Sequence, residues 1–139
     1  MGTTLIFPEG DPLIAQAAAY IQLQMRQQCP QARVHILVEP LPPRAFRPNL
    51  SSCAAHDFTI EVGPVPQGVV RHDAVQYTQH ALAGLLEFLE LRNQQGPQHV
   101  EAILREAYYN EKGSNDDDHR HHHGHVPCFH TAEDNTEDG

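Results

Sequence analysis

The sequence predicts an α/β fold in which a mostly parallel sheet is flanked by helices. Three short apolar segments, residues 3–7, 34–38 and 58–62, have the length and the β-branched content of strands. An amphipathic segment, residues 12–28, separates the first two. A strand, a helix and a second strand that is apolar on both faces indicate a βαβ unit with parallel pairing. A longer amphipathic segment, residues 73–92, supplies a second helix to cover the sheet.

The first helix has clear start and stop signals. Asp11 is a suitable N-cap because its carboxylate can accept hydrogen bonds from free amide groups, and Pro12 needs no amide hydrogen at the first helical position. Apolar residues then recur at helical spacing as far as Gln28, and Cys29-Pro30 ends the helix. The following strand, VHILV, is apolar on both faces, which is typical of a parallel sheet.

The rest of the body alternates between irregular and helical segments. Residues 39–50 hold four prolines in twelve positions, which predicts a long loop. The third strand ends in a turn-rich loop, residues 63–68, and Asp73 is the expected N-cap of the long helix. Gly96-Pro97 breaks that helix, and residues 96–112 form a short helix or a linker. One apolar stripe of the long helix is expected to face the core: Val75, Leu82, Leu85, Leu86 and Leu89.

Charge divides the 139 residues into a nearly neutral body and an acidic tail. Asp and Glu number 18 against 9 Lys and Arg, a net charge of −9. Residues 113–139 hold seven of the acidic residues, one basic residue and six of the eleven histidines. We expect this tail to be disordered, because it has little apolar surface to bury.

Composition also bounds the partners and the location. The acidic balance argues against nucleic-acid binding, which depends on Lys and Arg that neutralise phosphates. No run approaches the roughly 18 apolar residues that a membrane span needs. The first residues show no signal peptide, and three scattered cysteines, Cys29, Cys53 and Cys128, favour a reducing, cytoplasmic setting.

The expected sheet is too small to be self-sufficient. Strands with two apolar faces need covers on both faces and neighbours at both edges. Two long helices cannot supply all of these. We therefore expect the sheet to be part of a larger one, completed by further chain, by a second copy in a homo-oligomer or by a complementing polypeptide at the sheet edge.

Glu61 is the first candidate for chemistry. It lies near the C-terminal end of the third strand, and sites in open α/β sheets collect at the carboxyl ends of strands. A buried carboxylate there is suited to act as a general base. From the residues alone, a glutamate that simply faces solvent is the commoner alternative. His35 and the other four histidines of the body show no ligand spacing among themselves.

The segment around Glu61 resembles the signature of the aspartoacylase family, a branch of the zinc-carboxypeptidase-like hydrolases. Residues 58–73 read FTIEVGPVPQGVVRHD, and the family pattern is an apolar strand, Glu-Val-Gly-Pro-x-Pro-Gln-Gly-Val-x-Arg and a long helix. The first residues, MGTTLIF, are similar to the strand that follows the family's Asp-Leu-His-Asn-Thr-Thr segment. The resemblance implies that residues 1–95 are a partial zinc-carboxypeptidase-like catalytic domain. Residues 96–112 and the acidic, His-rich tail 113–139 follow it.

The resemblance implies zinc-dependent hydrolysis of the amide of small N-acyl amino acids such as N-acetyl-aspartate. In the family, two histidines and a glutamate hold the zinc, and a separate glutamate takes a proton from water; Glu61 matches that separate glutamate. The family's ligand segments, Gly-Gly-Thr-His-Gly-Asn-Glu and Asp-Leu-His-Asn-Thr-Thr, would precede Met1. We therefore expect this chain to be inactive, or nearly so, on its own.

Two further residues match weaker parts of the family pattern. Tyr108 lies in EAYYNEKG, which resembles a family segment, Glu-Ala-Ala-Tyr-Tyr-Glu-Lys, that supplies a tyrosine to the substrate. The alternative is an aromatic residue packed on the body. Arg47, or Arg44 in the same loop, is suited to bind a substrate carboxylate with two hydrogen bonds. The alternative is a solvated loop arginine.

The tail supports an alternative function of a different class. Residues 116–125 read DDDHRHHHGH, and His119, His121 and His123 are candidates to bind Zn, Cu or Ni loosely. On this alternative the chain is a non-catalytic metal-binding or interaction protein with the body as a scaffold. The simpler alternative, which the composition favours, is a solvated low-complexity tail without any metal.

Overall fold

The computed structural model describes residues 1–40, 42, 44–46 and 50–113. The elements expected for the body are present, with ends shifted by a few residues. The strands and helices are β1 (Gly2–Pro8), α1 (Pro12–Gln28), β2 (Arg33–Glu39), β3 (Thr59–Gly63), α2 (His72–Gln95) and α3 (Pro97–Gly113). Two short 3-10 turns, Arg44–Phe46 and Leu50–Cys53, lie between β2 and β3. The segment expected as a short helix or a linker is thus the 17-residue helix α3.

The three strands form one sheet in the order β2-β1-β3. Strands β1 and β2 are parallel, as the βαβ pattern predicts. Strand β3 runs antiparallel to β1, so the expectation of a mostly parallel sheet is wrong and the sheet is mixed. The physical reason is the connection, because a parallel β3 would need a crossover to the far end of the sheet. The described residues between β2 and β3 form two short turns and no crossover helix, and an antiparallel β3 begins near the end at which β2 finishes.

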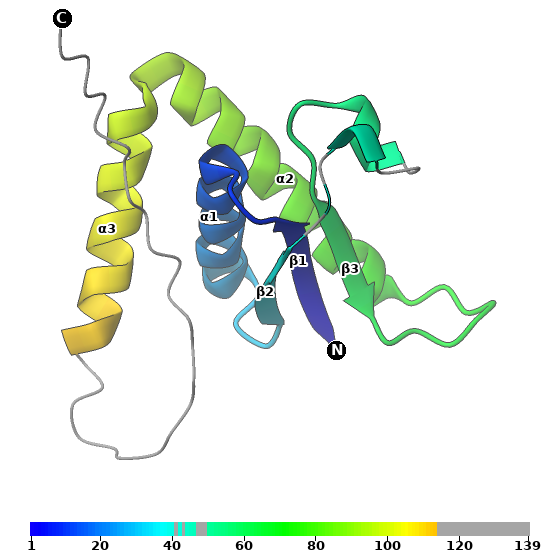
Figure 1. Ribbon diagram of the computed structural model, residues 1–139. Helices are drawn as coiled ribbons and strands as arrows, with labels where there is room; N and C mark the ends of the chain where they lie inside the picture. The colour runs from blue at the N-terminus through cyan, green and yellow to red at the C-terminus, as the bar shows by residue number, and fades with distance from the viewer. Residues whose placement is uncertain (41, 43, 47–49, 114–139) are drawn as a thin grey trace, which may run out of the picture.

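The helices cover one face of this sheet. Helices α1 and α2 pack against the face that carries the buried side chains of β1, and α3 lies beyond α1 (Figure 1). Leu5, Phe7, Ile21 and Met25 belong to the core between the sheet and the helices, and Phe88 belongs to a second core among the helices. The opposite face of the sheet is not covered by any described helix. The sheet is therefore covered by helices on one face only, which agrees with the expectation that two long helices cannot cover both faces.

The signals read for α1 are confirmed, and the cap read for α2 is wrong. Asp11 accepts a hydrogen bond from the Ile14 amide at 3.1 Å, and Cys29 caps the other end. Helix α2 begins at His72, so Asp73 lies inside its first turn rather than at the N-cap. There Asp73 is held by Arg71 at 2.7 Å, and the hydrogen bond from this guanidinium keeps the pKa of Asp73 below its ordinary value.

The face of α2 that packs on α1 is also not the expected one. Its buried residues are Tyr77, Ala81, Gly84 and Phe88. Of the predicted stripe, only Leu85 packs against the cores, and the other four side chains are exposed: Val75, Leu82, Leu86 and Leu89. The reason is close approach, since a Cβ on Gly84 would lie 3.5 Å from the Cα of Ile21. Small residues let the two helices meet there, and this outweighs the size of the apolar side chains on the other stripe.

Buried polar groups on the helix side are mostly partnered. The Tyr20 hydroxyl donates to Glu87 Oε1 at 2.9 Å, and burial beside that carboxylate raises the pKa of Tyr20 to about 12. Thr3 differs, because its hydroxyl is buried on β1 without a hydrogen-bond partner among the described residues. A buried hydroxyl without a partner lowers stability, since it has lost its hydrogen bonds to water.

Thr3→Val is therefore expected to stabilise the fold by about 1 kcal/mol, because it replaces an unpaired hydroxyl with a methyl group of the same shape. Urea unfolding followed by circular dichroism measures the change. Thr4→Val is the matched control, because Thr4 lies next along β1 on the uncovered face, and we expect a change within about 0.5 kcal/mol. A loss of stability in Thr3→Val would show that the hydroxyl is bonded in solution.

Candidate active site

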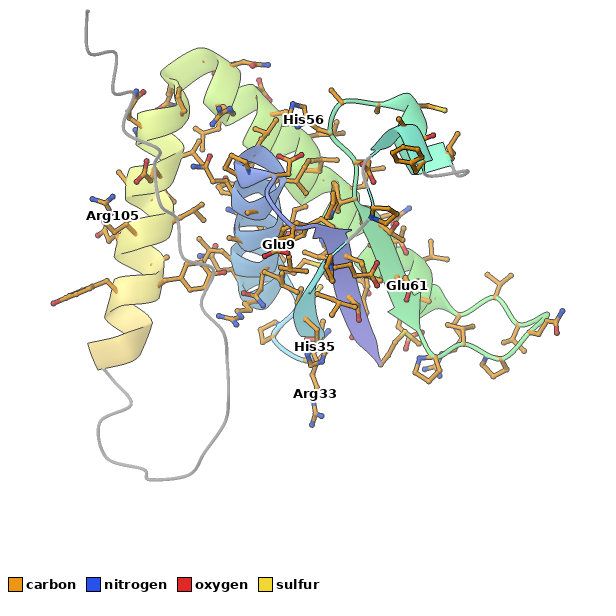
Figure 2. All side chains as sticks on the ribbon, viewed as in Figure 1. Glu9, Arg33, His35, His56, Glu61 and Arg105 are labelled. Atoms are coloured by element: carbon orange, nitrogen blue, oxygen red, sulfur yellow. The ribbon has the colours of Figure 1, made fainter. Side chains whose placement is uncertain are left out.

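The uncovered face of the sheet carries an open concavity with a volume of about 840 Å³. Its floor crosses all three strands, and its lining includes Thr4, Arg33, His35 and Glu61. The register explains the arrangement, because Thr4 of β1 lies opposite His35 of β2 on one side and Glu61 of β3 on the other. These three residues therefore form a row across the sheet. Figure 2 shows Glu61 on β3 and His35 on β2, on either side of β1.

Glu61 is positioned by the alternation of side chains along β3. Its neighbours Ile60 and Val62 are partly buried against the core, so Glu61 points to the opposite face of the sheet and is exposed. Glu61 therefore faces solvent, as the residues alone favour, and is not the buried carboxylate that would be suited to act as a general base. The carboxylate instead opens directly onto the concavity, and it forms no hydrogen bond or ion pair with the residues that the structure describes.

The loop that follows Glu61 forms one rim of the concavity. Gly63 and Pro64 line it and are joined by a cis peptide bond. Farther along, the Val69 amide donates to the Pro66 carbonyl at 3.2 Å, and Gly68 adopts a φ of 79°, which favours glycine. The turn chemistry expected for residues 63–68 is therefore present as a turn from Pro66 to Val69.

Sequence reasoning missed two residues of this face, Arg33 and His35. They alternate with Val34 and Ile36 along β2, and this alternation places them on the uncovered side. Neighbouring strands lie about 4.8 Å apart, so the backbones at His35 and Glu61 are roughly 10 Å apart. No hydrogen bond or ion pair joins the two side chains in the described structure. His35 and Glu61 share one face only because β1 pairs with both β2 and β3 in this register. The spacing of residues along the sequence does not reveal that register.

Tyr108 lies in a different place. Its side chain packs against the core that joins α1 and α3, and its hydroxyl contacts Gln22 Oε1 at 2.7 Å and the Ala19 carbonyl at 3.2 Å. Both partners belong to α1, on the helix side of the sheet, whereas Glu61 faces the other side. The structure therefore does not bring Tyr108 to the concavity, and its contacts are those of a packed aromatic residue.

The remaining candidates lie outside the described residues, and the described ones do not form a metal site. Arg47 and the tail histidines His119, His121 and His123 are not described. Within residues 1–40, 42, 44–46 and 50–113, no three His, Cys, Asp or Glu side chains are grouped to hold a metal ion. The concavity offers one carboxylate and one imidazole, from Glu61 and His35. This donor set does not fit a zinc ion, which needs at least three protein ligands.

The structure also describes two of the three cysteines and the helices that were considered as membrane spans. Cys29 and Cys53 are free thiols, Cys29 buried and Cys53 exposed. Among the described helices, none combines the length and the apolar character that crossing a bilayer requires.

Comparison with known proteins decides the family. No protein-family model and no solved structure matches the chain. It is 34% identical over 94 residues to an N-acyl-aromatic-L-amino acid amidohydrolase (carboxylate-forming) of Xenopus laevis, which covers 68% of this chain and 30% of that protein. It is 33% identical over 105 residues to an aspartoacylase of Xenopus tropicalis, which covers 75% of this chain and 32% of that protein. The chain belongs to the aspartoacylase family.

A third relative also bears the family name. A probable aspartoacylase of Acaryochloris marina (strain MBIC 11017) is 33% identical over 93 residues, which is 67% of this chain and 29% of that protein. The resemblance read from residues 58–73 is therefore confirmed at the level of the family. The chain spans about 30% of the length of the curated relatives that it matches. The carboxypeptidase-like fold stays a prediction, because no solved structure matches.

Tyr108→Phe is expected to lower the free energy of unfolding by about 1 kcal/mol, since it removes the hydroxyl that contacts Gln22 and Ala19. Urea unfolding measures this loss. Tyr109→Phe is the matched control, because Tyr109 is 76% exposed on the same helix, and its unfolding curve should coincide with that of the parent. Equal stability for both variants would remove the structural role that the contacts assign to Tyr108.

Proposed function

We propose that Glu61 performs proton transfer in the hydrolysis of the amide bond of small N-acyl amino acids. Three observations support this. The matched relatives are named as aspartoacylases and as amidohydrolases of N-acyl-aromatic amino acids. Glu61 lies in the most specific part of the family signature, EVGPVPQG. Its carboxylate faces an open concavity and has no partner among the described residues that would hold it away from a substrate.

The chemistry follows from the position of this carboxylate. Glu61 accepts a proton from a water molecule while the water oxygen attacks the acyl carbon. It then donates this proton to the amide nitrogen as the carbon–nitrogen bond breaks. The products are a carboxylic acid and a free amino acid. A side chain that faces solvent at the rim of a hollow can exchange protons in both directions, which this cycle requires.

The described residues supply the proton carrier and not the whole site. Zinc is expected from the family resemblance, but the concavity holds too few ligands for it, so we derive no step through a metal. The chain also covers about 30% of its relatives. We propose that the groups that activate water and polarise the acyl carbonyl come from outside the described residues, and that these residues alone do not hydrolyse the substrate. The acyl and amino-acid preference would then depend on those groups as well.

A chimaera tests the role of Glu61 directly. The segment of the Xenopus laevis amidohydrolase that matches this chain is replaced with the corresponding segment of this chain, and hydrolysis of N-acyl-aromatic amino acids is followed by release of the free amino acid. Glu61→Gln in the chimaera is expected to lower kcat by about a hundredfold or more with a small change in KM, because it removes the proton acceptor and keeps the shape.

The matched control is Glu90→Gln, an exposed glutamate on α2 that does not line the concavity. Its kcat should equal that of the parent chimaera. In the isolated chain, Glu61→Gln should change the free energy of unfolding by less than about 0.5 kcal/mol, since the side chain is exposed. An active chimaera that keeps its kcat in Glu61→Gln would disprove the proposal.

A further inference from the structure

Strand β2 presents a bare outer edge. It is the first strand in the order β2-β1-β3, and no described strand pairs with its outer side. The Glu39 carbonyl accepts from the Glu9 amide at 2.9 Å, so Glu39 directs its backbone groups toward β1. Because these directions alternate along a strand, the backbone groups of Val34, Ile36 and Val38 point outward. The Val34 carbonyl agrees with this direction, since it accepts a hydrogen bond from the Gln22 side chain of α1, not from β1, at 2.8 Å.

This edge has little protection against pairing. Edge strands of stable monomers are usually guarded by lysine, proline, a bulge or a covering segment. From Val34 to Val38 the strand has no charged residue other than a titratable histidine and no proline. Leu37 and Val38 are 45% and 46% exposed, and Gln22 covers only the first outward carbonyl. None of the described residues forms a hydrogen bond with the outward backbone groups of Ile36 and Val38, so another strand can pair with them.

The sequence of β2 is complementary to itself. The strand begins at Arg33, ends at Glu39 and has Ile36 at its centre. A second copy placed antiparallel about Ile36 would set each Arg33 opposite the partner's Glu39. Val34 would lie opposite the partner's Val38, and Ile36 would lie opposite the partner's Ile36. Residues with outward backbone groups then face each other, as hydrogen-bonded pairs require.

The charges strengthen this register. Arg33 and Glu39 direct their own backbone groups toward β1, so across the new interface they form non-hydrogen-bonded pairs, in which opposite side chains come closest. Two such pairs arise from the two-fold symmetry. Within one copy, the two residues are six positions apart, or roughly 20 Å, so they cannot pair with each other. Among the described residues, neither Arg33 nor Glu39 forms an ion pair.

We propose that two copies of this chain associate through antiparallel pairing of their β2 strands about Ile36, which joins two three-stranded sheets into one six-stranded sheet. The occupant of the edge is a second copy, because the antiparallel register about Ile36 satisfies the hydrogen-bonding pattern of the strand and also places its end charges, Arg33 and Glu39, opposite each other. The proposal does not depend on the role of Glu61. It requires only the geometry of β2 and its side chains.

A charge-swap series tests the pairing. Sedimentation equilibrium gives the dimer dissociation constant of the full 139-residue chain, of Arg33→Glu, of Glu39→Arg and of the double variant. Each single variant places like charges opposite each other twice and should weaken the dimer by about tenfold or more. The double variant restores opposite charges across the interface and should return the constant to near the parent value. Glu106→Arg, an exposed charge reversal on α3, is the control and should leave it unchanged.

Hydrogen exchange provides a second measurement that needs no variant. The amides of Ile36 and Val38 should become slower to exchange as the protein concentration rises, while the exposed amides of the turn before α2 should not. A chain that stays monomeric at every concentration overturns the proposal. So does a dimer whose constant is unaffected by the single variants, or one that the double variant fails to restore.

Discussion

Strand β1 is the element on which the rest of the structure depends, because it is paired on both sides and buried on one face only. Its odd-numbered residues, Thr3, Leu5 and Phe7, pack against the helices and anchor the main core. The alternate residues Gly2 and Thr4 line the concavity of the uncovered face. The same alternation fixes the neighbours through the register, so Glu61 and His35 reach the concavity only because Thr4 lies between them. Packing and the candidate site are thus two sides of one strand.

Local signals predicted the elements, and non-local contacts decided how the elements pack. Asp11, Pro12 and the Cys29-Pro30 pair define α1 through chemistry within a few residues of each end. The packed face of α2 could not be found in this way. The stripe of large apolar side chains predicted the wrong face of α2. Ala81 and Gly84 pack on α1 instead, because two backbones approach most closely where side chains are smallest. The direction of β3 likewise depends on the short turns that the described residues before it form in place of a crossover helix, and no motif in β3 itself encodes this.

The candidate site was predictable to the extent that it lies in one continuous segment. The EVGPVPQG motif identified Glu61. The alternation of apolar Ile60 and Val62 with polar Glu61 predicts that the carboxylate faces away from the core. His35 was not predictable, because its place beside Glu61 depends on pairing between strands that are distant in the sequence. Tyr108 illustrates the converse. A short resemblance suggested a substrate contact, whereas an amphipathic helix with a buried hydroxyl partner explains its position.

The two edges of the sheet separate the two kinds of association that this chain invites. Glu61 lies on β3, at one edge, and the self-complementary strand β2 forms the other, with β1 between them. A second copy on β2 continues the sheet away from Glu61, so it leaves the outer side of β3 and the rim at Gly63 and Pro64 accessible. It also keeps the helices of both copies on the same side of the joined sheet, because even-numbered residues of β2 lie opposite even-numbered residues of the second copy. The uncovered face therefore remains open in such a dimer, and groups that complete a hydrolytic centre at Glu61 can approach from that face or along β3.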